Sequence, residues 1–280
     1  MSLMLASVLF VIFVWWASTG AVLWLVQALD KQMHARLLFM TVVCALGFAG
    51  VIIASAHTTV WSVYMAFTSA ILIWGWIEFT LLSGLITGSE VNPCPPSISE
   101  TRRFWLAFKT ICYHEYVLLS AMCVLAVLDS TAGSGMAIKT FALLWFMRLG
   151  AKLTIFSGVP KLSTNMMPKR LAYMKTYFRE DRIGIGFWLS VSCCSLFLAA
   201  GIYGLVTIEY SSVTQTQIVM LVTLVSLALL EHVFMVMPFS ESSLWRWAMP
   251  KARNVADGSY RDKNALPSVK TNKKGAGYGF

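Results

Sequence analysis

Residues 61–86 read WSVYMAFTSAILIWGWIEFTLLSGLI, an apolar run in which Glu78 is the one charged residue. A helix needs about 20 mainly apolar residues to cross the roughly 30 Å hydrocarbon core of a bilayer, so this run can span a membrane. The whole chain is 58% hydrophobic and only 12% charged, which is unlike a soluble protein. The sequence therefore predicts an all-α protein, a polytopic bundle of transmembrane helices that includes 61–86.

Six further apolar runs have the same character. Together with 61–86 they predict seven transmembrane helices in a single domain over residues 1–250, because little sequence is left for a second domain. Residues 251–280 are basic and poor in apolar residues, so we expect a disordered tail there. The six other runs lie at about 5–28, 37–55, 111–128, 136–158, 184–207 and 216–238.

Lysine and arginine gather in alternate connections between the runs, and this pattern predicts the orientation. The basic segments are 29–36, 88–110, 159–183 and the tail, whereas the N-terminus, 56–60, 129–135 and 208–215 contain no lysine or arginine. By the positive-inside rule, we expect the N-terminus outside and the C-terminus in the cytoplasm. The net charge of +9 follows from this arrangement. It indicates attraction to anionic membrane lipids and does not imply nucleic-acid binding.

One basic connection also has amphipathic character. Pro168 precedes KRLAYMKTYFRED, in which Leu171, Met174 and Phe178 recur at helical spacing opposite basic residues. This pattern predicts an amphipathic helix at the cytoplasmic membrane surface, with Pro168 in its first turn. Such a helix serves as a surface linker or as a docking site for a partner.

Seven ionisable residues fall at about the same depth within the predicted spans. They are Glu78, Glu115, Glu231, His114, His232, Arg148 and Lys152. At about 1.5 Å per helical residue, each glutamate lies roughly 10 Å from the cytoplasmic end of its span. A charged side chain that faces lipid is costly, so we expect these residues to face one another in a buried polar layer.

The first interpretation of this polar layer is an internal ion-pair network. Lys152 or Arg148 would pair with Glu115 or Glu231, and the histidines would donate to neighbouring groups. Such a network would be neutral overall and would fix how the helices pack.

The second interpretation is a metal site. Carboxylates and imidazoles bind iron and manganese, and the three glutamates and two histidines of the layer are candidate ligands. The protein would then be a metal-dependent membrane oxidoreductase acting on a pigment precursor or another lipid-soluble substrate. Di-iron bundles, however, take ligands from Glu-x-x-His, whose side chains share one helix face. The pairs His114–Glu115 and Glu231–His232 are adjacent, about 100° apart, and the nearby cations also disfavour a metal ion.

The third interpretation is pigment binding. The neutral imidazole of His114 or His232 could ligate the central metal of a tetrapyrrole within the membrane. Several aromatic residues could line a flat apolar pocket nearby. They are Trp74, Trp76, Phe104 and Trp105.

A set of short motifs resembles a known family over residues 9–250. The motifs are Trp15–Trp16 with Ser18, Thr19 and Gly20, then WGWIE at 74–78, NPCPP at 92–96, HEY at 114–116, MRLGAKL at 147–153, LEH at 230–232 and LWRWAM at 244–249. In this order and spacing they resemble the PuhE family. Its members are membrane proteins from the photosynthesis gene clusters of purple and related anoxygenic bacteria, described as photosynthetic complex assembly proteins.

The resemblance implies a role in assembling the photosynthetic reaction centre and its core antenna, in the bacterial cytoplasmic or intracytoplasmic membrane. The protein would bind or deliver bacteriochlorophyll, with His114 and His232 as candidate ligands, or contact a reaction-centre subunit, an antenna subunit or a pigment-synthesis enzyme. An assembly factor needs no turnover chemistry, and the resemblance assigns none. In the family, a histidine often precedes the glutamate of the third span and another often precedes the position of His114. This chain has Ile77 and Tyr113 there, which removes two potential metal ligands.

Reporter fusions test the predicted orientation. A reporter fused after Phe280 should be cytoplasmic, and one inserted near Thr131 should be external, because the basic connections stay inside. Alkaline phosphatase and green fluorescent protein distinguish the two sides. The reverse pattern would contradict both the orientation and the depth assigned to the polar layer.

Overall fold

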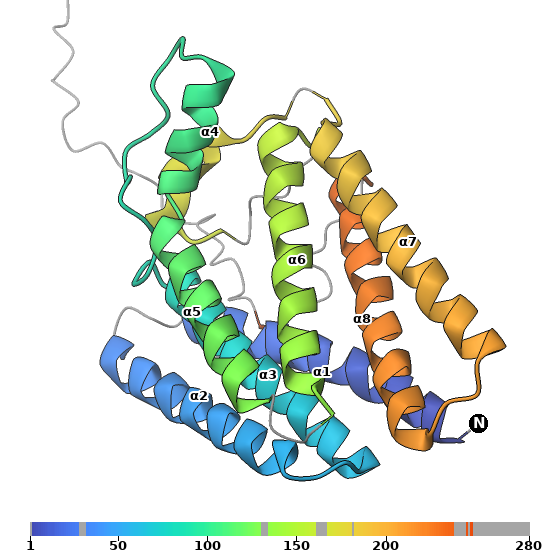
Figure 1. Ribbon diagram of the computed structural model, residues 1–280. Helices are drawn as coiled ribbons and strands as arrows, with labels where there is room; N and C mark the ends of the chain where they lie inside the picture. The colour runs from blue at the N-terminus through green and yellow to red at the C-terminus, as the bar shows by residue number, and fades with distance from the viewer. Residues whose placement is uncertain are drawn as a thin grey trace, which may run out of the picture. The chain divides into compact units, whose positions relative to one another are not determined.

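The computed structural model describes residues 2–27, 32–129, 134–160, 167–180, 182–237, 245 and 247–248. Over these residues it contains eight α-helices, one 3₁₀ helix and no strand (Figure 1). The prediction of an all-α protein is confirmed. The basic tail predicted at 251–280 lies outside the described residues.

Six helices of the described chain are long and apolar enough to cross a membrane. They coincide with six of the predicted apolar runs, with ends that differ by a few residues. Within lipid every backbone N–H and C=O must find an internal partner, so apolar segments of this length become helices. The six are α1 (Ser2–Gln27), α2 (Met33–Ser55), α3 (Val60–Leu82), α6 (Met136–Ser157), α7 (Ile185–Thr207) and α8 (Ser212–Val236).

The predicted fourth span, 111–128, differs from the others. Its apolar part is α5 (Cys112–Leu128), which meets the polar helix α4 (Glu100–Lys109) at a bend of 62°. The two helices qualify as a seventh candidate span only when they are taken together. The bundle therefore has six candidate spans, or seven if the bent pair is one span.

The segment that follows α3 explains the break between α4 and α5. The His114 N–H donates to the Thr87 carbonyl at 3.0 Å, and the Glu90 N–H donates to the Lys109 carbonyl at 3.2 Å. In a continuous α-helix the His114 N–H would donate to the Thr110 carbonyl and the Lys109 carbonyl would accept from the Tyr113 N–H, so these bonds replace two helical ones. The partners lie 27 and 19 residues apart along the chain, so helical periodicity gives no sign of the break.

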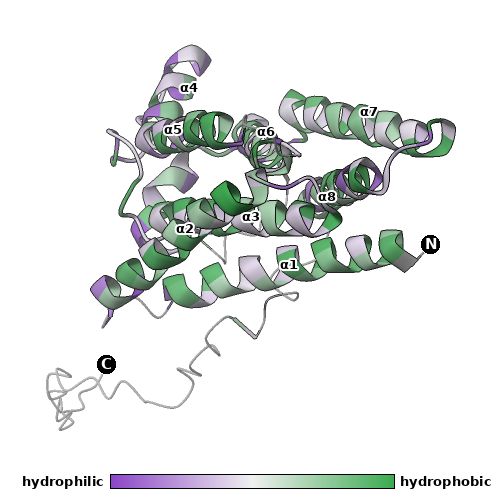
Figure 2. Cartoon of the chain, turned by 60° about the horizontal axis from the view of Figure 1, so that its bottom comes forward, coloured by the Kyte–Doolittle hydropathy of each residue, from purple (hydrophilic) through white to green (hydrophobic). Residues whose placement is uncertain are grey.

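Helix α3 lies at the centre of the bundle. It contacts α1, α2, α5, α6 and α8, and Figure 2 shows it between α1 and α6. Its side chains Phe67, Ile73 and Ile77 are almost completely buried, together with Leu118 of α5 and Phe141 of α6. This packing places Glu78, the charged residue of α3, in the interior of the bundle.

The predicted amphipathic helix is instead a 3₁₀ helix, η3 (Lys169–Tyr177), with Pro168 as the residue before it. A 3₁₀ helix has three residues per turn, so its buried side chains are Leu171, Met174 and Tyr177. Phe178, the residue after η3, is half-buried and packs against the same cluster as Leu171 and Met174, as the sequence predicted. Leu171 and Met174 pack against Leu81 near the end of α3, so the protein itself covers this apolar face.

Close packing of α2 against α3 depends on Gly47. A Cβ atom at this position would lie 2.9 Å from Ile73 Cγ1 and 3.0 Å from the Ser69 carbonyl oxygen. At Gly75, within α3, the nearest such neighbour would be 3.8 Å away. The two positions form a matched pair, since both are helical and only Gly47 is crowded.

We expect Gly47→Ala to lower the free energy of unfolding by about 1–2 kcal/mol, because α2 and α3 must move apart to accommodate the methyl group. Gly75→Ala should raise it by roughly 0.5–1 kcal/mol, since alanine is the better helix former. Unfolding in mixed micelles with increasing sodium dodecyl sulfate, followed by circular dichroism, measures both changes. Equal effects from the two substitutions would contradict the packing described.

Candidate functional site

Lys152 and Glu115 form an ion pair between α6 and α5. Lys152 Nζ lies 2.5 Å from Glu115 Oε1, and the two side chains are 19% and 12% exposed. The indole N–H of Trp145 donates to Oε2 of the same carboxylate at 3.1 Å. Trp145 and Lys152 lie two turns apart on one face of α6. Both oxygens of Glu115 are therefore bonded to this one helix.

Arg148 and Glu78 form a second ion pair, one turn away along α6. Arg148 Nη2 lies 2.9 Å from Glu78 Oε2, and the Glu78 side chain is 11% exposed. The expected acids for Arg148 were Glu115 and Glu231, and the structure gives it Glu78 on α3 instead. Arg148 and Lys152 lie on one face of α6. Arg148 connects this helix to α3, and Lys152 connects it to α5.

Glu231, the third glutamate, is bonded to α1. The indole N–H of Trp15 donates to Glu231 Oε1 at 2.9 Å. Trp15 also packs edge to face against Trp245, with ring centroids 5.5 Å apart. The Trp245 indole N–H donates in turn to the Trp16 carbonyl. The C-terminal motif therefore contributes a tryptophan that packs beside the donor to Glu231.

The two histidines of the layer are buried, and each has a ring nitrogen without a hydrogen-bond partner. His114 is 0% exposed, and neither of its nitrogens has a partner among the described residues. His232 is 1% exposed, with Nδ1 2.8 Å from the Ala228 carbonyl and Nε2 unpartnered in the same set. A carbonyl only accepts, so Nδ1 of His232 carries a hydrogen, and in the neutral ring Nε2 then presents a lone pair.

The carboxylates and imidazoles do not converge on one point. Among the described residues, no three His, Cys, Asp or Glu side chains come close enough together to hold a metal ion. Glu78, Glu115 and Glu231 belong to α3, α5 and α8, and each is bonded to a different side chain. The geometry is that of a network of separate pairs.

The four aromatic residues considered for a pigment pocket lie in three different environments. Trp74 packs edge to face against Phe141 of α6, and the Trp76 indole N–H donates to a threonine of α2. Phe104 and Trp105 pack against each other on α4, with centroids 5.8 Å apart. They do not form the walls of a single pocket.

Sequence reasoning missed the tryptophan donors. Trp15 stood out only as part of a motif, and Trp145 did not stand out at all. A signal for Trp145 exists, because it precedes Lys152 by seven residues and therefore shares its helix face. No comparable signal connects Trp15 with Glu231, since the two residues belong to helices at opposite ends of the chain.

Removing one partner of the Glu115–Lys152 pair should destabilise the bundle more than replacing both. Lys152→Met leaves a buried carboxylate without its cation, and we expect the free energy of unfolding to fall by about 3 kcal/mol. The double variant Glu115→Gln, Lys152→Met removes both charges and should recover most of this loss. Unfolding of the three proteins in mixed micelles gives the comparison.

Lys139→Met is the matched control. Lys139 lies on the same helix, is exposed, and donates to neutral oxygens of Ser134 and Gln217. Its replacement should change the free energy of unfolding by less than about 1 kcal/mol. A double variant as unstable as Lys152→Met would show that the pair does not act as a unit.

Comparison with known proteins identifies a relative and a matching family. One relative is an uncharacterized 30.4 kDa protein in the puhA 5′ region of Rhodobacter capsulatus, 37% identical over 259 residues that cover 88% of this chain and 91% of the relative. No solved structure matches the chain significantly. Residues 1–256 match the family described as "Protein of unknown function (DUF3623)". The chain belongs to this DUF3623 family.

Proposed function

We propose that this protein is an assembly factor for the bacterial photosynthetic reaction centre and core antenna. The relative from Rhodobacter capsulatus comes from the puhA 5′ region, a photosynthesis gene region. The motif resemblance to the PuhE family supports the same role. The apolar helices fit a multi-pass protein of the cytoplasmic or intracytoplasmic photosynthetic membrane, where these complexes are built.

The pairing of the three glutamates of the polar layer is the observation that carries this proposal, and one oxygen, Glu78 Oε1, has no hydrogen-bond partner among the described residues. Glu78 is paired with Arg148, Glu115 is bonded to Lys152 and Trp145, and Glu231 accepts from Trp15. A carboxylate that already holds a cation or an indole N–H is poorly placed to bind a metal ion or to take a proton from a substrate. Such a network suits a protein that holds its helices in a fixed arrangement and binds a partner.

A metal-dependent oxidoreductase has less support. Its ligands would come from the same three glutamates and two histidines, and no three of them come close enough together in the described structure to hold a metal ion. Arg148 and Lys152 would also place two positive charges next to the ion. The ligand types are suitable for iron or manganese, but their arrangement is not.

The unused imidazole nitrogens favour bacteriochlorophyll as one ligand of the assembly factor. A neutral imidazole nitrogen with a lone pair can ligate the central metal of a tetrapyrrole. In the polar layer, His114 and His232 offer such nitrogens. Because both rings are buried, a pigment would reach them only when neighbouring helices separate. A reaction-centre subunit, an antenna subunit or a pigment-synthesis enzyme is the alternative partner, bound at the apolar outer face of the bundle.

Complementation tests the assembly role. Deleting the gene of the relative in Rhodobacter capsulatus should lower the near-infrared absorbance of the reaction centre and core antenna, and this chain supplied in trans should restore it. Glu115→Gln, Lys152→Met should restore less than Lys139→Met at equal protein level, because only the first change alters the polar layer. Immunoblots of the membranes establish the protein level. Unchanged amounts of both complexes in the deletion strain would refute the assembly role.

Absorption spectroscopy tests the pigment. If His114 ligates bacteriochlorophyll, protein purified from a pigmented host should carry a near-infrared band that His114→Leu removes or shifts. His57→Leu is the control, because His57 is exposed and lies outside the polar layer. Colourless wild-type protein from such a host would count against pigment binding and leave a protein partner as the basis of the assembly role.

A further inference from the structure

A pocket of about 380 Å³ lies where the start of α4, the end of α6 and the start of α7 meet. It is separate from the polar layer and belongs to the side of the bundle that carries the basic connections. Three arginines and one glutamate line it, so its wall has a surplus of positive charge. The charged lining residues are Glu100, Arg103, Arg179 and Arg182.

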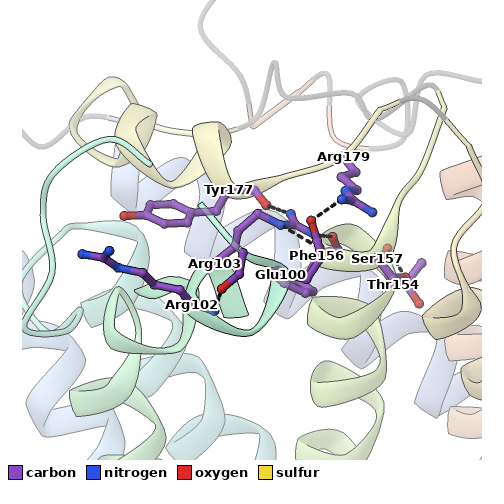
Figure 3. A network of polar contacts seen from close by, with 9 residues as sticks. Glu100, Arg102, Arg103, Thr154, Phe156, Ser157, Tyr177 and Arg179 are labelled. Atoms are coloured by element: carbon purple, nitrogen blue, oxygen red, sulfur yellow. Dashed lines mark hydrogen bonds and ion pairs between the residues drawn. The ribbon is translucent and has the colours of Figure 1, made fainter. Parts of the chain in front are cut away.

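Glu100 is shared by two of these arginines. Arg103 Nη2 lies 3.0 Å from Glu100 Oε2, and Arg179 forms an ion pair with the other carboxylate oxygen (Figure 3). Arg103 also donates to the carbonyls of Tyr177 at 2.6 Å and Phe156 at 3.2 Å. Arg103 is therefore a buried structural residue, and the one acid of the wall already has two cations.

Arg182 is the arginine of this pocket that has no acidic partner among the described residues. It is exposed, and it has no hydrogen bond or ion pair with any described residue. Ile185, the first residue of α7, lines the same pocket, and the dipole of this helix adds partial positive charge at its start. Arg182 thus lines a pocket in which Glu100 is the one acid among the described lining residues, and that acid is already paired with Arg103 and Arg179.

Backbone bonds hold the wall in place. The Val159 N–H donates to the Arg179 carbonyl at 2.9 Å, and the Gly184 N–H donates to the Gly158 carbonyl at 3.0 Å. A Cβ atom at Gly184 would lie only 2.4 Å from Ser157, so glycine is needed for this approach. The end of α6 and the segment carrying the arginines are fixed against each other, and a ligand would meet a site that is already formed.

We propose that this pocket binds a phosphate group, with the headgroup of an anionic phospholipid as its source. Arginine binds phosphate oxygens through parallel N–H groups, and Arg182 with the outer edge of Arg179 can supply them. The pocket lies beside the ends of two membrane-spanning helices, where lipid headgroups lie. Beyond it, Ile185, Trp188 and Leu189 form an exposed apolar surface on α7 along which an acyl chain can pack.

Lipid titration of the full chain tests the site. Purified protein in neutral detergent is titrated with phosphatidylglycerol, phosphatidylcholine or inorganic phosphate, and bound ligand is counted by native mass spectrometry. Phosphatidylglycerol should bind in preference to phosphatidylcholine, and Arg182→Gln should weaken its binding about fivefold, the effect of losing one charge-assisted contact. Arg102→Gln removes the same charge from an exposed side chain that points away from the pocket, and it should change binding little (Figure 3).

The three ligands separate the possible sources of the phosphate. Binding of inorganic phosphate without phosphatidylglycerol, lost in Arg182→Gln, would keep the phosphate site and replace the lipid with a soluble phosphate compound. Equal binding by Arg182→Gln and Arg102→Gln would overturn the site. Equal retention of phosphatidylcholine and phosphatidylglycerol would do the same. Circular dichroism and size-exclusion chromatography establish that both variants are folded.

Discussion

Two basic side chains one turn apart on α6 hold the polar layer of this protein together. Lys152 reaches Glu115 on α5, and Arg148 reaches Glu78 on α3. A charge inside a bilayer must find a partner or pay a large desolvation penalty, so these pairs restrict how three helices can pack. The restriction matters most for α5, which is short and bends away from α4, and whose carboxylate takes both of its bonds from α6.

The sequence pointed to the charged residues of this layer, but it missed the tryptophan donors and did not give the pairing. Depth along each span follows from counting residues, and it brought Glu78, Glu115 and Glu231 to one level. Which helices are neighbours does not follow from depth, so the partner of Arg148 was misassigned. The break before Cys112 depends on hydrogen bonds to residues 87–90, and η3 depends on packing against Leu81. Both are contacts between distant segments, which hydropathy and periodicity do not report.

The chemistry of the layer follows from which groups are satisfied. Each glutamate has a cation or an indole N–H as a partner. Among the described residues, Glu78 Oε1 and at least one ring nitrogen of His114 and of His232 have no hydrogen-bond partner. A buried polar atom without a partner is costly, and a protein tolerates it most readily where a ligand can provide the missing bond. The buried histidines are therefore candidate binding groups beside the acids, which attract notice in the sequence.

Positive charge along α6 connects the polar layer with the arginine-lined pocket. Arg148 and Lys152 lie in the C-terminal half of this helix, and Arg103 donates to the Phe156 carbonyl in its last turn. The C-terminus of a helix carries partial negative charge in its last turn, which favours the Arg103 guanidinium at the Phe156 carbonyl. The positive-inside rule predicts that this end lies on the cytoplasmic side, where anionic headgroups gather. Basic side chains on and beside α6 therefore pair with acids inside the bundle and, at its surface, leave Arg182 as a cation for a phosphate group.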